Sequence, residues 1–444
     1  MIYTMRKILF LYVILFSTAA FAQKSEMLLT LEEALDYAVV HSPTLNVERI
    51  KLKEASIEVD EKRLHHVPDI FLSGDLRRNL IISATPVPAR AFDPTAQEGE
   101  LIYLKFNTKW NSSTGLNLNY DLFNPEKINS VAEQQHQLNI QEYDTQISEE
   151  ELKERVAIAY AECVIAEEQM QMLKSDTAYY SEFLNNANQL FYKERISLSE
   201  RNDAHSSYNE SIMNFLEAEK IVKERRVQLL YLLGIDVTKD NIESLLLHEN
   251  ISALTEKMEE NTSVTYTISS LEELRQQEVV DLAGMRIKSA SLKYAPTISL
   301  QGYYGTNFYD NELSLFNNNL WRGNSYIGLS LRVPITQSLS TSKEVSRLRL
   351  HKQIEAENLR DIRNSVNKDR LNNLSLLQVR KESYRLSREN WQMSMQNSEA
   401  IQMQYEKGYI QQADLLNEKL KIQQFRQKYL QSAYDLFNSF VAIK

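Results

Sequence analysis

The sequence predicts a mainly α-helical protein with a membrane β-barrel, built from two copies of one helix-strand-strand-long helix-turn-helix unit. Three observations support this prediction: long stretches with heptad spacing, four tracts in which apolar and polar residues alternate, and similarity between the two halves. The 444 residues include only 10 Gly and 8 Pro. Because these residues interrupt regular structure, so few of them favour long elements.

The first 22 residues have the pattern of a signal peptide. A short apolar core over residues 8–16 is followed by Ala-Phe-Ala at residues 20–22, an A-x-A cleavage site. The alternative, an N-terminal membrane anchor, is less favoured because this apolar core is too short to span a bilayer. We expect the mature chain to begin near Gln23 and to carry no lipid there, since no cysteine follows the core.

Composition narrows the class of protein. The 50 basic and 60 acidic residues give a net charge of −10, which becomes about −12 once Arg6 and Lys7 leave with the signal peptide. This charge argues against a nucleic-acid partner. Cys163 is the only cysteine, which excludes an intrachain disulfide, and its place on a heptad seam predicts that it is buried. No later stretch has about 18 consecutive apolar residues, so we expect no transmembrane helix in the mature chain.

Four tracts alternate with period two, as strands with one apolar and one polar face do. They cover about residues 69–80, 101–123, 297–308 and 321–333. A soluble sandwich also alternates, but the second tract is much longer than the usual strand of about five or six residues. Aromatic residues of the kind that line membrane interfaces accompany the tracts. They are Tyr103, Phe106, Trp110, Tyr120, Tyr304, Phe308, Trp321 and Tyr326.

In an exported chain, such strands fit an outer membrane, with the apolar face toward lipid and the polar face toward water. Four strands cannot close a barrel, and lipid tolerates no open sheet edge because each unpaired backbone group there costs several kcal/mol. The chain must therefore oligomerise. The strand count leaves two alternatives, eight strands from a dimer or twelve from a trimer.

Each pair of strands leads into a stretch with heptad spacing. We expect a long helix over about residues 127–194 with a return helix over about 198–233, and a second pair over about 338–406 and 411–443. At 1.5 Å per residue, a helix of about 65 residues is on the order of 100 Å long. The helices are therefore of coiled-coil length.

The two halves repeat each other. Residues 55–74 match residues 283–302 at an offset of 228, whereas residues 115–192 match residues 328–405 at an offset of 213. The difference of 15 residues predicts a longer loop between the first two strands than between the last two, as exposed loops tolerate insertion.

This repeat divides the chain into a signal peptide (1–22), a first repeat (23–234), an equatorial connection (235–269) and a second repeat (270–444). The connection is polar and irregular, with one plausible short strand, VTYTIS, at residues 264–269.

Helix starts have local signals. Thr30 with Glu33, and Ser270 with Glu273, have the spacing of a capping box. The Ser-Pro dipeptide at residue 42 fits a cap followed by a proline at the first helical position.

The order of these elements resembles the TolC-like outer membrane efflux proteins, the outer membrane factors of tripartite efflux and type I secretion systems. The resemblance rests on the signal peptide, the duplicated halves and the turn YEKGYIQQADLLN at residues 405–417, and it covers essentially the whole mature chain. It implies a homotrimer that shares a twelve-stranded barrel in the outer membrane of a Gram-negative bacterium. It also implies a periplasmic helical tunnel that passively conducts substrates from an inner-membrane efflux or ABC transporter and a periplasmic adaptor protein.

The resemblance places the functional end at the turns that close the two helix pairs. Gly408 corresponds to the glycine of the second turn, where a left-handed conformation is needed. Tyr405 corresponds to a tyrosine that holds the closed tip, Asp414 corresponds to a gate aspartate, and Asn417 stands where a second aspartate is common. If three Asp414 carboxylates converge on an axis, they repel one another and favour bound cations; the alternative is a solvated aspartate at a helix end.

The first turn departs from the family pattern. Arg195 is expected in place of the glycine and Arg201 in place of an aspartate. The residues implied to contact the adaptor are Ile196 and Ser197 in the first turn and Tyr409 and Ile410 in the second.

We expect no enzyme activity, no metal and no cofactor. The seven histidines show no ligand spacing, and the chain has no phosphate loop, dinucleotide fingerprint or G-x-S-x-G motif. Met393, Met395 and Met403 suggest soft-metal export, but packing within a coiled coil is the favoured interpretation. Two functions of different class remain: an efflux or secretion channel, and a non-conducting coiled-coil protein anchored in the outer membrane.

Overall fold

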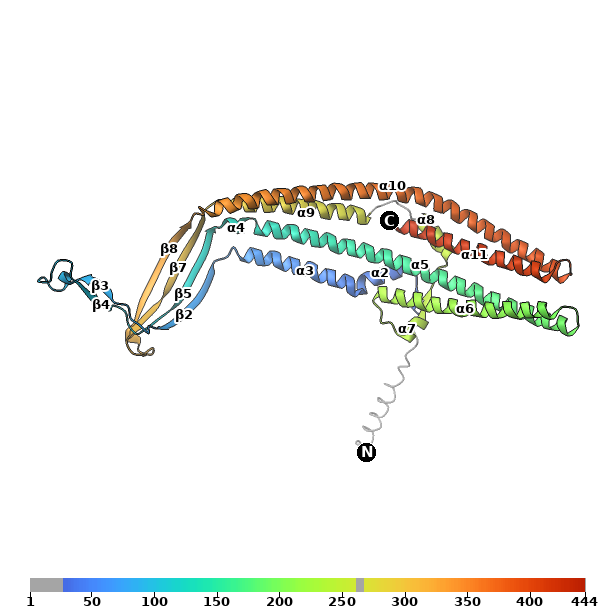
Figure 1. The fold of residues 1–444 in the computed structure, drawn as a ribbon, viewed down its shortest axis with the longest axis horizontal. Helices are drawn as coiled ribbons and strands as arrows, with labels where there is room; N and C mark the ends of the chain where they lie inside the picture. Colours follow the sequence, from blue (N-terminus) through green and yellow to red (C-terminus); the bar gives the residue numbers. More distant parts are fainter. Residues whose placement is uncertain (1–26, 261–266, 444) are drawn as a thin grey trace, which may run out of the picture. The chain divides into compact units, whose positions relative to one another are not determined.

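The computed structural model describes residues 27–260 and 267–443 (Figure 1). The predicted signal peptide and its cleavage site lie outside these residues. The chain divides into two compact units. Unit 2 comprises Leu52–Gln141 and Arg275–Leu359, and unit 1 comprises the rest.

The sheet of unit 2 has four antiparallel strands in the order β2-β5-β7-β8. Each strand lies in one of the four alternating tracts. Their bounds are β2 (Asp69–Arg78), β5 (Trp110–Phe123), β7 (Thr297–Asp310) and β8 (Trp321–Arg332). β2 and β8 each pair on one side only, so the sheet has two edges at which backbone groups lack a strand partner.

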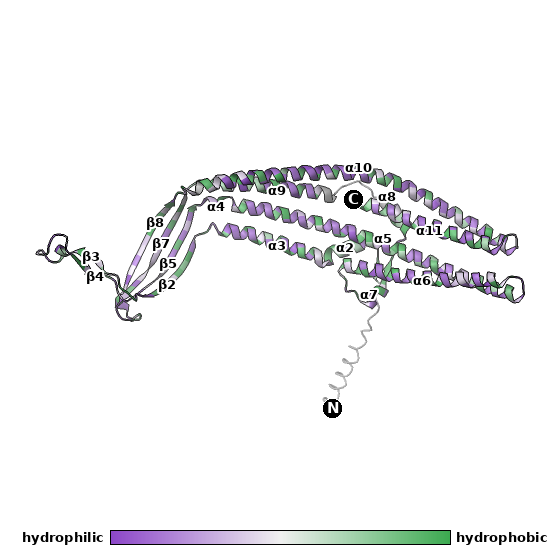
Figure 2. Ribbon diagram, in the orientation of Figure 1, coloured by the Kyte–Doolittle hydropathy of each residue, from purple (hydrophilic) through white to green (hydrophobic). Residues whose placement is uncertain are grey.

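The two faces of this sheet differ in polarity, which appears in Figure 2 as alternating colours along the strands. The register pairs apolar residues across strands, such as Leu72 with Leu116 and Leu300 with Leu329. These apolar residues stay exposed: Leu72 is 73% and Leu329 70% exposed. An apolar face of this extent needs a cover other than water.

One predicted tract is not a single strand. Residues 101–123 form two strands, β4 (Leu101–Leu104) and β5. The chain turns between them, where Asn79 Nδ2 donates to the carbonyl oxygen of Thr108 at 2.8 Å. As a result β4 pairs with β3 (Thr85–Pro88) in a separate two-stranded ribbon, which we call the β3-β4 ribbon. Alternation alone does not reveal such a turn, because it continues on both sides.

The helical part of unit 2 consists of segments of four helices that contact one another in sequence. The helices are α3 (Pro43–Leu64), α5 (Ser130–Tyr192), α9 (Thr267–Leu292) and α10 (Gln337–Glu406). Gln134 Nε2 of α5 donates to Glu58 of α3 at 2.6 Å. His136 of α5 contacts Glu278 of α9 at 2.7 Å, and Gln276 of α9 donates to Glu355 of α10 at 2.8 Å. The short α4 (Pro125–Ile128) precedes α5, so the first long helix is interrupted at Asn129.

Unit 1 holds the main core. Its further elements are β1 (Met27–Leu29), α2 (Leu31–His41), α6 (Leu198–Leu233), α7 (Lys239–Ser244), β6 (Leu245–Leu247), α8 (Ile251–Glu260) and α11 (Gln412–Val441). Tyr160, Leu229 and Phe437 are fully buried in one apolar cluster. Cys163 is buried in the same cluster, as predicted, and burial raises the pKa of its thiol.

The connection between the halves differs from the prediction. Residues 264–266 of the expected VTYTIS strand lie outside the described residues, and residues 267–269 begin α9. The prediction that Ser270 caps a helix is also wrong, because Ser270 lies inside α9, while Glu273 accepts a hydrogen bond from Arg363 Nε at 2.7 Å. The short strand is instead β6, which pairs in parallel with β1. Such long-range pairing has no local sequence signal.

The start of α2 agrees with the prediction. Thr30 is the cap, and Thr30 with Glu33 forms a complete capping box. α3 begins at Pro43, directly after Ser42. No helix within residues 27–260 and 267–443 has an apolar stretch of the length that a membrane crossing requires.

A buried carboxylate joins the first described residues to the connection. Glu249, whose side chain is only 5% exposed, accepts hydrogen bonds from Lys257 Nζ, from the Leu31 backbone N–H at 2.9 Å and from the Tyr160 hydroxyl at 3.1 Å. Burial alone opposes ionisation of this carboxyl, but these three donors outweigh it and lower its pKa. The Tyr160 hydroxyl also contacts the Leu29 carbonyl oxygen at 2.9 Å.

Replacing Glu249 should destabilise unit 1. We expect Glu249→Gln to lower the free energy of unfolding by about 1 to 3 kcal/mol, because charge-assisted hydrogen bonds in a buried site are lost. The pKa of Glu249 is depressed when folded, so its contribution is present above the ordinary value of 4.5 and is lost as the pH falls through the folded value. Thermal unfolding by circular dichroism between pH 3 and pH 7 should therefore show a smaller loss below about pH 4.5 in the variant.

The matched control is Glu219→Gln. Glu219 forms an exposed pair with Lys223 on α6 at 3.0 Å, and exposed pairs contribute little. An equal loss of stability in both variants would contradict the assignment.

Candidate functional site

The two turns singled out by the sequence both belong to unit 1, where each joins a long helix to its return helix (Figure 1). Residues 193–197 join α5 to α6, and residues 407–411 join α10 to α11.

The second turn is closed by a glycine in the left-handed conformation. Gly408 has φ +75°, as predicted. Its N–H donates to the Tyr405 carbonyl oxygen at 2.9 Å, and the Tyr409 N–H donates to that of Gln404 at 2.9 Å. This pair of bonds is a Schellman ending, which favours glycine because a side chain is strained there. A Cβ added at Gly408 would meet no atom within 4 Å, so the preference is purely conformational.

The first turn repeats this pattern without glycine. Glu194 has φ +56°, and it is the only non-glycine residue with positive φ among those described. Its N–H donates to the Phe191 carbonyl oxygen at 2.9 Å, and the Arg195 N–H donates to that of Leu190 at 2.9 Å. Glu194, not Arg195, is therefore the counterpart of Gly408.

The correction has a simple cause. The helices on both sides of the turns are offset by 214, from Leu198 to Gln412 and from Tyr192 to Glu406. The offset of 213 that we used to align the turns is therefore one residue short at this end of the helices.

With the offset of 214, a different residue of the first turn corresponds to Asp414. Ser197 caps α6 and its backbone N–H donates to Glu200 at 2.7 Å, while Gln411 caps α11 and its N–H donates to Asp414 at 3.3 Å. Glu200, rather than Arg201, is thus the counterpart of Asp414. Each turn carries one carboxylate at the third helical position.

Hydrogen bonds from the Ser197 backbone N–H and hydroxyl hold the pKa of Glu200 below its usual range. Arg201 has a different role: its guanidinium lies over the Phe191 ring, 4.9 Å from the centroid, a cation–π contact.

The two turns pack on each other through a small apolar cluster. Its buried members are Tyr180, Phe183, Ala187, Ala204 and Leu415. Tyr405 and Ile196 pack against it half-buried, and the Tyr405 ring centroid is 6.1 Å from that of Phe183. Burial, together with the charge of Glu200, raises the pKa of the Tyr405 hydroxyl.

Polar contacts reinforce this packing. Gln412 Nε2 donates to the Glu200 carbonyl oxygen at 2.9 Å. Farther along the helices, Arg426 Nη2 of α11 pairs with Asp176 of α5 at 2.7 Å, with the two side chains 11% and 26% exposed. Sequence reasoning missed this pair because its members are 250 residues apart and each has an ordinary helical setting.

The remaining predicted site residues lie at the surface of this chain. Asp414, Asn417, Tyr409, Arg195 and Ser197 are exposed, and Ile410 is half-buried. Met393, Met395 and Met403 are 47%, 48% and 54% exposed, so they are not core residues within this chain. Within the described part of the chain, no three His, Cys, Asp or Glu side chains gather closely enough to hold a metal ion.

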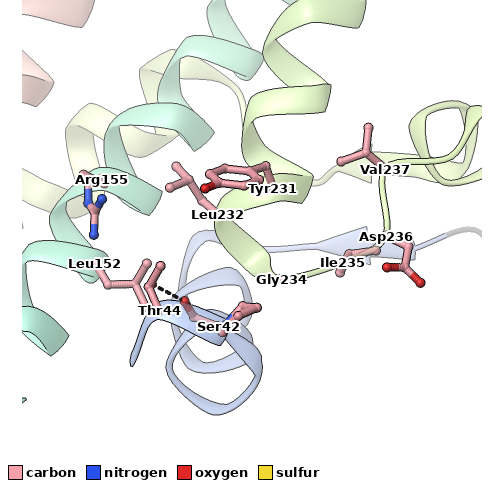
Figure 3. Close-up of a pocket in the computed structure, with 11 residues that line it drawn as sticks. Ser42, Thr44, Leu152, Arg155, Tyr231, Leu232, Gly234, Ile235, Asp236 and Val237 are labelled. Atoms are coloured by element: carbon pink, nitrogen blue, oxygen red, sulfur yellow. Dashed lines mark hydrogen bonds between the residues drawn. The ribbon is translucent and has the colours of Figure 1, made fainter. Parts of the chain in front are cut away.

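A hollow of about 310 Å³ lies elsewhere in unit 1, between the α2–α3 junction, α5 and the end of α6 (Figure 3). Gly234 ends α6 with φ +75°, and a Cβ there would lie 2.6 Å from the His41 carbonyl oxygen. The Ser42 and Thr44 hydroxyls bond each other at 2.8 Å.

Comparison with known proteins finds one matching family. Residues 34–235 match the profile described as outer membrane efflux protein. Over these residues, a little under half of its length, the chain resembles the outer membrane efflux protein family. No curated protein sequence matches the chain.

Solved structures show a likeness in fold that extends to both halves of the chain. The CmeC outer membrane channel of Campylobacter jejuni has a TM-score of 0.73 at 16% identity, over 93% of this chain and 84% of that one. The outer membrane protein VceC of Vibrio cholerae has a TM-score of 0.71 at 14% identity, over 93% and 94%. The open-state MtrE outer membrane channel of Neisseria gonorrhoeae has a TM-score of 0.69 at 15% identity, over 93% and 89%. At these identities the likeness shows a shared fold.

The two turns allow a paired test of backbone strain. We expect Gly408→Ala to destabilise the protein by about 1 kcal/mol, because alanine is disfavoured at positive φ. Glu194→Gly should have the opposite sign, stabilising by up to about 1 kcal/mol, because it relieves the same strain. Hydrogen exchange of the turn amides and thermal unfolding measure both. If Glu194→Gly lowered the free energy of unfolding, the Glu194 side chain would stabilise the turn by more than the backbone strain destabilises it.

Proposed function

We propose that this protein is the outer-membrane exit duct of a tripartite efflux or type I secretion system. It conducts substrates passively from an inner-membrane pump and a periplasmic adaptor to the exterior. The observation that carries the proposal is the sheet of unit 2, which combines one exposed apolar face, one polar face and two unpaired edges in a chain that resembles the outer membrane efflux protein family.

The faces of the sheet support a water-filled pore through lipid. On the polar face, Asn117 Nδ2 donates to Ser73 Oγ at 2.7 Å and Ser113 Oγ donates to Asp75. A polar interior needs water, and the opposite face, with Leu72 and Leu329, needs hydrocarbon.

The edges support a closed ring of copies. β2 and β8 cannot remain unpaired in lipid, and β8 of one copy is antiparallel to β2 of the next if the strand order simply continues. The family resemblance selects three copies, which give twelve strands. The long helices that follow each strand pair would continue the wall through the periplasm.

The turns at Glu194 and Gly408 then lie at the periplasmic tip. We propose that Ile196, Ser197, Tyr409 and Ile410 contact the adaptor. Tyr405 would hold the tip closed through its packing beside Phe183. Asp414 and Asn417 would border the entrance, with Glu200 as a further acidic residue.

A conductance measurement tests the proposal. Purified protein in planar bilayers should show discrete channels and a trimeric mass in detergent, because a polar-lined ring admits ions. A trimer that inserts without conducting would instead support the non-conducting anchored coiled-coil protein.

Ion selectivity tests the tip. We expect the channel to prefer cations and Asp414→Asn to weaken this preference, because three carboxylates near one axis attract cations. The reversal potential in a salt gradient measures the change. Asp414 also completes the cap of α11, so the matched control is Gln411→Ala, which alters the same cap without removing a charge. If Asp414→Asn left the reversal potential at its original value, the assignment would be wrong.

A further inference from the structure

The β3-β4 ribbon of unit 2 is an apolar element that its own chain leaves uncovered. The register places Pro86 opposite Tyr103 and Pro88 opposite Leu101 on one face. On that face Tyr103 is 69% and Leu101 51% exposed. An isolated two-stranded ribbon is marginally stable at best, so a ribbon with an exposed apolar face needs a surface to pack on.

The β3 edge of the ribbon is poorly suited to contact by strand addition. Two of the four residues of β3 are proline, and proline has no N–H to donate to an added strand. Contact through the β3 edge by strand addition is therefore disfavoured, and side-chain packing on Tyr103 and Leu101 is favoured.

The other connection of the sheet carries a complementary group. Residues 311–320 join β7 to β8, and Phe316 among them is 100% exposed. Hydrogen bonds hold this loop on both sides of Phe316: Ser314 Oγ donates to Asp310 at 2.6 Å, and Trp321 Nε1 donates to the Leu315 carbonyl oxygen at 2.8 Å. Phe316 thus projects, fully exposed, from a loop that these hydrogen bonds hold.

The strand order indicates which part of a neighbouring copy Phe316 can contact. The β3-β4 ribbon leaves the sheet beside the edge strand β2, and the 311–320 loop leads into the opposite edge strand β8, at the same end of the sheet (Figure 1). If copies join β8 to β2, as the proposed function requires, the loop of one copy comes beside the ribbon of the next.

We propose that Phe316 packs on the Tyr103 face of the β3-β4 ribbon of a second copy of this chain. This apolar contact stabilises the interface between β8 of one copy and β2 of the next, at the end of the sheet where the ribbon and the loop lie. The contact rests on the proposed function and adds to it a named side-chain pair outside the strands. It covers the exposed face of the ribbon and the fully exposed phenylalanine at once.

Cross-linking of the full-length oligomer tests the pair. The variant Phe316→Cys with Tyr103→Cys, treated with a short bis-maleimide, should give covalent dimers and trimers on denaturing gels. The native Cys163 is buried and should not compete. Each variant with only one of the two introduced cysteines should stay monomeric on the gel. Cross-links confined to one chain, no cross-links at all, or dimers from Phe316→Cys alone would each overturn the proposal.

A double-mutant comparison gives a second readout. Phe316→Ala and Tyr103→Ala should each lower the temperature at which the oligomer dissociates. The dissociation temperature of the double variant should be little lower than that of either single variant, because each substitution removes the same contact. Tyr231→Ala, which removes an aromatic of similar exposure (64%) from unit 1, is the matched control. Fully additive losses would overturn the contact.

The two proposals fail in different ways. An oligomer that conducts but shows neither cross-links nor coupling would retain the proposed duct and lose the Phe316 contact. A protein that forms no oligomer would remove the basis of both.

Discussion

The need to pair the two edges of one sheet constrains most of this molecule. β2 and β8 each have a single strand neighbour, and an unpaired edge is a site for pairing with another chain even in water. In hydrocarbon it is prohibitive. The exposed apolar face of the same sheet favours hydrocarbon as its surroundings. Under the proposed function, pairing of β2 with β8 of another copy satisfies both edges, and the exposed apolar residues of the connecting loops would then lie at the contact between copies.

The duplication of the two halves is the second constraint on the structure. It is preserved in the backbone geometry of the two turns. Both turns close with the same two hydrogen bonds, although one has Gly408 and the other Glu194 at the left-handed position. The capping carboxylates also recur, as Glu200 and Asp414. Hydrogen-bond geometry is thus common to the two halves where side-chain identity is not.

In unit 1, the residues that hold the fold together are buried, whereas the predicted functional residues are mostly exposed. Tyr160 and Glu249 tie distant segments together in a buried network, and Arg426 with Asp176 joins α11 to α5. The predicted tip residues, by contrast, lie mostly at the surface. Their placement on helices held by a packed cluster, rather than on long loops, gives the tip defined geometry within one chain.

The sequence by itself determined the elements whose signals are local and repeated. Alternation located β7 and β8 to within two residues, and heptad spacing with turn signals located α6 at its observed bounds. The family resemblance of the turn also predicted a left-handed Gly408, and glycine is the residue that this conformation favours. Only the tertiary structure decided that β4 leaves the second tract to pair with β3, that β6 pairs with β1, and that Glu194 and Glu200 are the counterparts of Gly408 and Asp414. Each of these depends on hydrogen bonds between distant segments or on a one-residue register, and neither leaves a periodic trace in the chain.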